Sequence, residues 1–250
     1  MQTSFIPRAL RALVPATLLL AACGKSDTPA PTPAPDQGKI MVVHAAAAAN
    51  STPITALAND QQIGQVNYGQ NSAYTAVNTG SIVVKANNGT AQLSNKTITL
   101  LKDQSYSVFA YSPAATIGSV DLLPVVDDLT APASGTAKVR IVHLGVGAPT
   151  PVRLSIPSPT PTGSPTDLTP DVAFGTASGF VAVNAGPLNL IVTSGTTTRT
   201  QLVAVGDGSG AGTGTKTFDA GKIYTVVVRG VSGNGVPAAQ QIQGVIITNN

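Results

Sequence analysis

From residue 39 onward, short apolar runs alternate with clusters of turn residues. The runs are rich in Val, Ile and Thr, a pattern typical of strands rather than helices. In the first part of the chain it predicts strands at 39–44, 54–58, 63–67, 73–77, 82–87, 91–100, 105–111 and 118–126. Asn88-Gly89 lies between two of them and predicts a type I′ hairpin turn. Strands at this spacing predict a sandwich or a barrel.

The same pattern occurs twice along the chain. The matched segments are 39–44 with 138–143, 66–69 with 172–175, 74–80 with 180–186, and 106–109 with 224–227. The second copy is longer because it carries two additional loops, 157–170 and 206–214. A repeat of this length predicts two tandem domains. We place them at 39–131 and 136–250, with the Pro- and Gly-containing segment 129–135 between them.

Composition supports an all-β protein. The chain has 25 Gly and 19 Pro, no Trp, and only 10% charged residues. All acidic residues are Asp, and Glu, a good helix former, is absent. We therefore expect two tandem antiparallel β-sandwich domains, of the immunoglobulin or transthyretin type. The single cysteine excludes an internal disulfide.

The first 22 residues have the features of a secretory signal peptide. Arg8 and Arg11 precede the apolar segment 12–20, which is too short to span a membrane. The segment ends in Leu-Ala-Ala-Cys at 20–23, and so resembles the lipobox of bacterial lipoprotein precursors. The resemblance implies cleavage before Cys23, a diacylglycerol thioether on Cys23, and an acyl chain such as palmitate on the new amine. Gly24 in place of Asp implies the outer membrane if the cell is Gram-negative.

Cys23 is the first residue of the segment 23–38, a tether that is rich in Pro, Thr and Ala. Proline favours extended polyproline II conformation, which would hold a domain away from the membrane. Loss of Arg8 and Arg11 with the signal peptide removes two of the three net positive charges. No basic patch remains that would support nucleic-acid binding.

The two segments that end in histidine, KIMVVH at 39–44 and KVRIVH at 138–143, resemble a family of bacterial domains of unknown function, DUF4397. Members occur in secreted proteins and lipoproteins, so the resemblance implies a sandwich fold and a position outside the cytoplasm. It implies no reaction. In that family an Asp commonly follows the histidine at a distance. Here the corresponding positions near 55–56 and 152–153 contain none, which argues against a ligand role for a His/Asp pair.

His44 and His143 are the only histidines and end matching strands of separate predicted domains. Catalytic zinc usually needs three protein ligands, so we predict no metal site. Local hydrogen bonding at the strand ends is the favoured interpretation of both histidines. A ligand-binding role for either is the alternative.

No pattern indicates a catalytic residue or a cofactor. The chain has no G-x-S-x-G motif, and the Gly-rich loop 206–214 lacks the G-K-[ST] of a phosphate-binding loop. Asp127-Asp128 is interpreted as a solvated pair that leads into the linker. The repeated aromatic positions predict core packing rather than a carbohydrate platform; they are Tyr68, Tyr74, Tyr106, Phe174, Phe180 and Tyr224.

The sequence thus predicts a lipid-anchored protein of the bacterial cell envelope, periplasmic or surface-facing, that acts as a non-enzymatic structural or binding module. Its expected partners are the membrane, through the lipid, and an envelope protein or glycan. One alternative is a carbohydrate- or peptide-binding lipoprotein that uses loops 157–170 and 206–214. Another is an envelope hydrolase, which would require one of the histidines to lie near both an Asp and a Ser.

Overall fold

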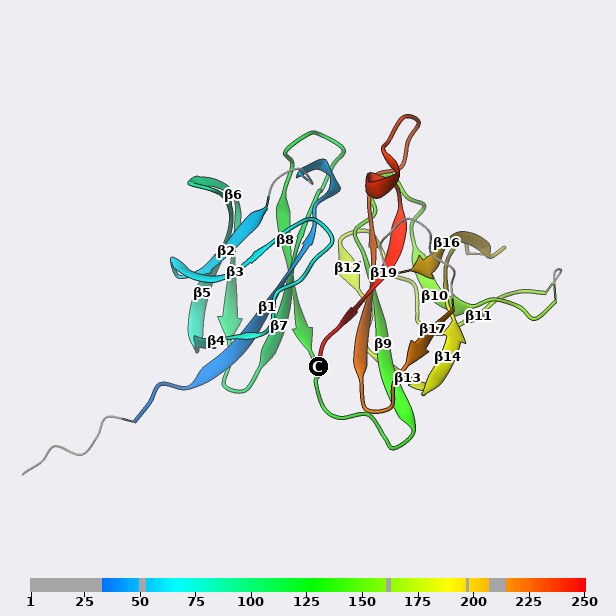
Figure 1. Cartoon of the computed structure of the whole chain (residues 1–250), viewed down its shortest axis with the longest axis horizontal. Helices are drawn as coiled ribbons and strands as arrows, with labels where there is room; N and C mark the ends of the chain where they lie inside the picture. The colour runs from blue at the N-terminus through cyan, green and yellow to red at the C-terminus, as the bar shows by residue number, and fades with distance from the viewer. Residues whose placement is uncertain (1–32, 50–52, 161–162, 197, 207–214) are drawn as a thin grey trace, which may run out of the picture. The chain divides into compact units, whose positions relative to one another are not determined.

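The computed structural model describes residues 33–49, 53–160, 163–196, 198–206 and 215–250, and Pro35–Asn250 form one compact unit (Figure 1). Its regular elements are strands and two short 3-10 turns, η1 (Ala47–Ala49) and η2 (Ala238–Gln240). The predicted all-β class is confirmed. Within these residues, no helix has the length and apolar character needed to cross a bilayer.

The first half contains two four-stranded sheets, in the orders β4-β1-β7-β8 and β3-β2-β5-β6 (Figure 1). Their strands are β1 (Gln37–Ala45), β2 (Ile54–Ala58), β3 (Gln61–Val66), β4 (Thr75–Asn78), β5 (Gly80–Asn88), β6 (Ala91–Leu100), β7 (Ser105–Tyr111) and β8 (Asp121–Asp127). All eight predicted strands are present, and 54–58, 91–100 and 105–111 have the predicted bounds.

The second half contains a nine-stranded curled sheet and the separate pair β14-β17. The large sheet has the order β11-β10-β15-β16-β19-β18-β9-β12, and β13 also pairs with β9. The strands are β9 (Thr136–His143), β10 (Val152–Ile156), β11 (Thr166–Asp167), β12 (Thr176–Ala177), β13 (Val181–Asn184), β14 (Gly186–Asn189), β15 (Ile191–Ser194), β16 (Thr200–Gly206), β17 (Thr215–Phe218), β18 (Ile223–Arg229) and β19 (Gln243–Thr248). A short parallel contact between β16 and β19 makes this sheet continuous, so the expected sandwich is wrong for the second half, where the strands other than β14 and β17 form one curled sheet.

The expectation of purely antiparallel sheets is wrong. β1 pairs in parallel with β7 over seven positions, and β9 pairs in parallel with β18 over six. Parallel neighbours require a long crossover connection. Hairpin signals in a sequence report only strands that are adjacent along the chain, so they could not reveal these two pairs.

The predicted type I′ turn is also misplaced. Asn88 pairs with Ala91, so Gly89 and Thr90 are the central turn residues, and of these only Gly89 has a positive φ. A type I′ turn needs positive φ at both central positions. That geometry occurs instead between β2 and β3, where Asn59 and Asp60 have φ of 46° and 68°.

Three apolar clusters of described residues hold the fold together. One lies between the two sheets of the first half, and one lies inside the curled sheet of the second half. The third packs β1 and β7 against β9, β18 and β19. Side chains of β1 alternate between clusters: Ile40 and Val42 point into the first, while Met41 and Val43 point into the third. The continuous apolar runs of β1, β9 and β18 therefore reflect burial on both faces.

We call the third cluster and the polar groups around it the junction. At one end, the Arg140 guanidinium lies 2.5 Å from an Asp127 carboxylate oxygen, and both side chains are almost fully buried. Arg140 Nε also donates to Thr225 Oγ1, and Ser107 Oγ donates to Asp127. The Tyr74 hydroxyl donates to the same carboxylate at 2.6 Å. Burial and the neighbouring Asp127 charge raise the pKa of Tyr74.

The other end of the junction is aromatic. The Arg229 guanidinium lies over the Tyr68 ring, 4.4 Å from its centroid, and Tyr68 packs edge-on against His44. Tyr111 packs edge-on against Phe174, which in turn packs against His143. The four aromatic residues Tyr68, Tyr74, Phe174 and Phe180 therefore lie at the junction, whereas Tyr106 and Tyr224 pack against the separate cores.

The outer edge of one sheet carries a proline. β8 is an edge strand, and Pro124 lies at its centre, opposite Val108 of β7. Proline has no N–H, so it is tolerated in a strand only where no ladder partner needs one. The opposite edge of the same sheet, β4, contains no proline.

Candidate functional site

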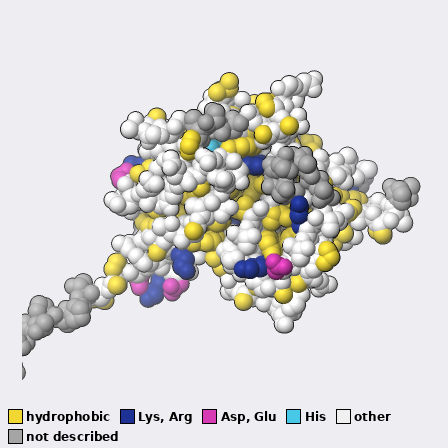
Figure 2. Space-filling model, viewed as in Figure 1, with side chains coloured by type: hydrophobic (Ala, Val, Ile, Leu, Met, Phe, Trp, Pro, Cys, Tyr) yellow, Lys and Arg dark blue, Asp and Glu magenta, His cyan; other side chains and the backbone are white. Residues whose placement is uncertain are grey.

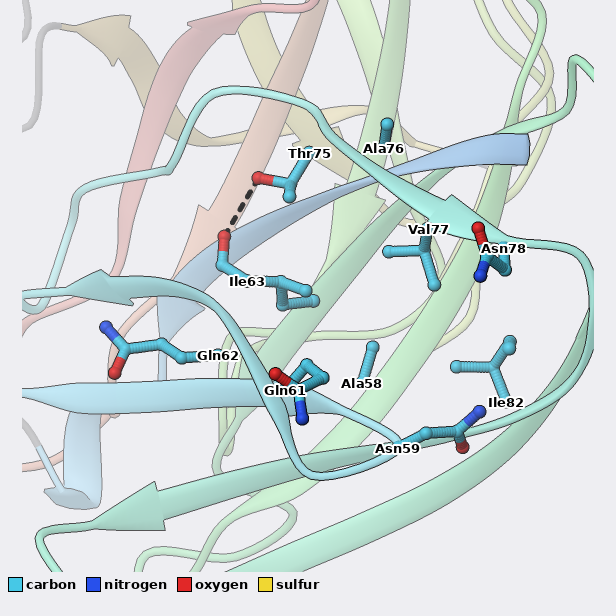
Figure 3. Close-up of a pocket in the computed structure, with 10 residues that line it drawn as sticks. All are labelled: Ala58, Asn59, Gln61, Gln62, Ile63, Thr75, Ala76, Val77, Asn78 and Ile82. Atoms are coloured by element: carbon cyan, nitrogen blue, oxygen red, sulfur yellow. Dashed lines mark hydrogen bonds between the residues drawn. The ribbon is translucent and has the colours of Figure 1, made fainter. Parts of the chain in front are cut away.

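One cavity of the first half opens between the edge strand β4 and the other sheet (Figure 3). It measures about 270 Å³. Ile63, Val77 and Ile82 point into it, and Asn78 lies at one end (Figure 3). The Thr75 hydroxyl donates to the Ile63 carbonyl at 2.9 Å and so ties the two sheets together beside the opening. The remaining lining residues are Ala58, Asn59, Gln61, Gln62, Thr75 and Ala76.

A second cavity of about 290 Å³ lies at the matching place in the second half. Its lining includes Ala182, Val183 and Asn184 of β13, which match Ala76, Val77 and Asn78 of β4. The other residues of the lining are Thr136, Ile156, Leu168 and Leu188. We call these two cavities the paired pockets.

Neither lining contains a charged side chain, a histidine or a cysteine. The floor is aliphatic, and the rim carries amides and a threonine hydroxyl. Figure 2 shows that charged side chains are also sparse on the visible face of the molecule. A lining of this kind offers no general acid, general base or metal ligand, but it can bind an uncharged, partly apolar group.

A third hollow, of about 520 Å³, lies where loops of the two halves meet. Residues that follow β1, β7 and β18 line it, including the turn 232–235. Ile117, on this rim, is 93% exposed. Isolated exposed apolar residues are common on soluble proteins, so Ile117 does not define a binding surface by itself.

His44 and His143 lie at matching places, and both side chains are fully buried. The carbonyl of each accepts a backbone N–H at 2.8 Å, from Gly69 and Gly175 respectively. His44 Nδ1 accepts the Ala46 N–H at 3.3 Å.

The His143 ring makes no hydrogen bond of good geometry within the described residues. Burial lowers the pKa of His143 to about 4, and the Pro149 carbonyl opposes this shift. His143 is therefore neutral near pH 7.

Among the described residues, no group of three or more His, Cys or Asp side chains is arranged to hold a metal ion. Cys23, the predicted lipid site, lies outside the described residues, as do the predicted signal peptide and most of the tether. The same holds for 207–214, nearly all of the predicted Gly-rich binding loop.

The other predicted binding loop, 157–170, is fastened to the sheet by ion pairs. Arg153 contacts Asp167 and Asp171, and Arg199 also contacts Asp167. The Ser155 hydroxyl adds a hydrogen bond to Asp167. Asp167 belongs to β11, so part of the predicted loop is a short strand.

The prediction of a solvated Asp127-Asp128 pair is wrong for Asp127. Its side chain is fully buried against Arg140, whereas Asp128 is exposed and contacts Lys138. The pair straddles the end of β8, which sends one carboxylate into the junction and leaves the other in water.

The paired pockets were missed by motif reasoning, although the sequence contains a signal for them. The longest segment of the internal repeat, 74–80 with 180–186, covers β4 and β13, and these are the strands that line both pockets. The core-packing prediction concerned only the repeated aromatic residues; Val77 and Val183, which pack against the two cores, and their exposed neighbours Ala76 and Ala182 received no interpretation.

Residues 38–151 match the model of a domain of unknown function, DUF4397. This confirms the resemblance for the first half; the match continues through β9 and ends at Pro151. No curated protein matches the chain.

Two solved structures are similar at 11% identity and a TM-score of 0.18 each. One is a leucine-rich repeat protein from Bacteroides thetaiotaomicron VPI-5482, where the match covers 79% of this chain and 26% of that one. The other is a putative adhesin from Bacteroides ovatus, with 83% and 95% covered. The chain thus spans about a quarter of the first structure and most of the second.

Proposed function

We propose that this protein is a non-enzymatic binding module of the bacterial cell envelope. In this proposal it is anchored by lipid on Cys23 and carries two tandem all-β domains, 39–131 and 136–250. The observation that carries the proposal is the presence of the same uncharged pocket at matching positions of both halves.

Matching hydrogen bonds support the idea that the halves are copies of one domain. The Val42 N–H donates to Ser72 Oγ at 3.0 Å, and the Ile141 N–H donates to Ser178 Oγ at the same distance. Each serine hydroxyl then donates to the carbonyl of the next residue. These contacts join residues that the internal repeat aligns, although loops of different length separate them along the chain.

The use of the buried polar groups supports a binding role over an enzymatic one. Arg140, Asp127, Ser107 and Thr225 are occupied with one another in the junction. Groups fixed in this way stabilise the joining of the two halves and are withheld from solvent and substrate.

The anchoring part of the proposal is tested by Cys23→Ser. In a bacterium grown with radioactive palmitate, the wild-type protein is expected to carry label and to sediment with the membranes. The variant is expected to lose both. Unchanged labelling and sedimentation of the variant would overturn the anchor.

The binding part is tested with the detergent-solubilised full-length protein and envelope fragments from which detergent has removed the lipid, so that the acyl chains on Cys23 have no bilayer to enter. Co-sedimentation is expected, and its absence at micromolar concentrations would overturn the binding role. Protease treatment of the fragments should abolish co-sedimentation if the partner is a protein, and periodate oxidation should abolish it if the partner is a glycan.

A further inference from the structure

We infer that β4 and β13 are two equivalent sites for an extended, uncharged peptide segment, which adds as a strand and inserts an apolar side chain into the adjacent pocket. This inference rests on the proposed binding function and specifies its ligand. It is argued from the hydrogen-bonding directions of the two strands, the size of the pockets and the residues at the edges.

The backbone of β4 has free hydrogen-bonding positions on one side. β4 is an edge strand, and within the described part of the chain it pairs only with β1. The Thr79 N–H donates to the Asp36 carbonyl, toward β1. Because directions alternate along an antiparallel ladder, Val77 also faces β1, and the backbone groups of Ala76 and Asn78 face away from it.

The backbone of β13 has the same arrangement. Among the strands that the structure describes, β13 pairs only with β9, and the Ala185 N–H donates to the Gly135 carbonyl at the start of that strand. Val183 therefore faces β9, and the backbone groups of Ala182 and Asn184 face outward. Each half thus presents outward N–H and C=O groups at the same two aligned positions.

The pocket volumes limit the size of the group that can enter. Sites for whole small molecules commonly measure about 300–1,000 Å³. The paired pockets, at about 270 and 290 Å³, lie at the lower end of this range and are large enough for one or two apolar side chains. In strand addition the backbone supplies affinity, and pockets select alternate side chains. An apolar floor beside an edge strand has this arrangement.

The edge residues favour an uncharged segment. Natural edge strands are usually protected by charges or prolines, as β8 is by Pro124. The sequences TAVN in β4 and VAVN in β13 contain neither. Ala76 and Ala182 are exposed, so little side-chain bulk hinders the approach of a second strand.

The test uses the detergent-solubilised full-length protein and a fluorescein-labelled octapeptide of alternating Val and Thr. N-methyl groups along one edge of the peptide prevent it from pairing with itself. Isothermal titration is expected to give two peptides per chain. A matched peptide with every amide N-methylated is expected not to bind, because it cannot donate to the strand edge.

Two variants locate the sites. Ala76→Pro or Ala182→Pro is expected to reduce the stoichiometry from two to one, and the double variant is expected to abolish binding. Proline removes an N–H that faces away from β1 or β9, so the fold keeps its own ladder. The matched controls Ala76→Val and Ala182→Val retain the N–H and should still bind two peptides. Circular dichroism and thermal unfolding check that each variant is folded.

The inference is overturned if the octapeptide does not bind, if the fully N-methylated peptide binds equally well, or if the double proline variant still binds two. Should the variants fail to fold, the comparison of the two peptides on the wild-type protein decides. Envelope co-sedimentation without peptide binding would leave the proposed binding function standing and reject strand addition alone.

Discussion

The two ends of the junction bury an arginine in opposite ways. Arg140 is ion-paired with Asp127 and donates to Thr225. Arg229 has no carboxylate partner among the described residues; it lies on the Tyr68 ring, and its Nε and Nη1 make no hydrogen bond there. Burial lowers the pKa of Arg229. A buried cation can therefore be tolerated through charge pairing or through an aromatic face, and the two solutions should respond differently to mutation.

Among the substitutions that test this contrast, Arg140→Met should lower the free energy of unfolding the most. The substitution leaves Asp127 buried without its cation, which typically costs about 3–5 kcal/mol. Met is the natural choice because Met41 occupies the matching position of β1. The free energy of unfolding in urea measures the effect.

The control for that prediction is the double variant Arg140→Met with Asp127→Asn. Asn249 lies next to β18 in the second half, at the position that matches Asp127 next to β7 in the first half. An amide side chain therefore already occupies this position in the second half. The double variant is expected to recover most of the lost stability, because no charge is left unpaired. Equal destabilisation of the single and double variants would show that packing, rather than charge, dominates.

The pH dependence of stability probes the aromatic end. Because the folded pKa of His143 is about 4 against an ordinary 6.5, the neutral ring is favoured in the fold. The neutral ring contributes about 3 kcal/mol to the free energy of unfolding. This contribution is fully present above about pH 6.5 and is lost as the pH falls toward 4. The wild-type minus His143→Met difference, measured by urea denaturation across this range, isolates the effect from aspartate titration. A constant difference would contradict it.

A pair of glycine substitutions compares the two aromatic contacts. Gly69 and Gly175 have φ of 85° and 75°, so Ala should cost about 1–2 kcal/mol at either. At Gly69 the added Cβ would also collide with the Arg229 guanidinium, whereas at Gly175 the nearest atom is the Tyr111 hydroxyl at 3.7 Å. Gly69→Ala is expected to lower the melting temperature more than Gly175→Ala. Equal effects would mean that Arg229 moves aside freely.

Arg229→Met should have the smallest effect. The substitution removes a cation–π interaction worth about 1–2 kcal/mol, but it also removes a buried charge with unsatisfied donors. These terms oppose one another, so the net change in unfolding free energy is expected to stay within about 1 kcal/mol. A loss as large as that of Arg140→Met would erase the distinction between the two ends.

The sequence predicted local structure well because the relevant signals are local. Strands such as 91–100 and 105–111 are bounded by turn residues, and their bounds agree with β6 and β7. The parallel pairs, the junction and the Arg140–Asp127 contact depend on residues that are distant along the chain. In KVRIVH the arginine is one charge in an apolar run, and nothing nearby in the sequence identifies its partner or its burial.

The candidate site was predictable only in part. Alignment of 74–80 with 180–186 marked the right strands, but period-2 patterning distinguishes inward from outward side chains and carries no information on which backbone groups are paired. That Ala76 and Ala182 lie on open edges depends on the strand order, β4 beside β1 alone and β13 beside β9 alone.

Pro124 makes the two edges of the first sheet unlike, and this limits how further copies can add to it strand by strand. Strand-by-strand growth into a filament requires that each added chain present a pairing edge like the one it used. A second copy that docked its β4 against another molecule would turn a β8 edge outward, where Pro124 withholds an N–H. Addition at β4 would therefore stop after one step on this sheet, so the first sheet can keep an open edge for a partner without itself growing strand by strand.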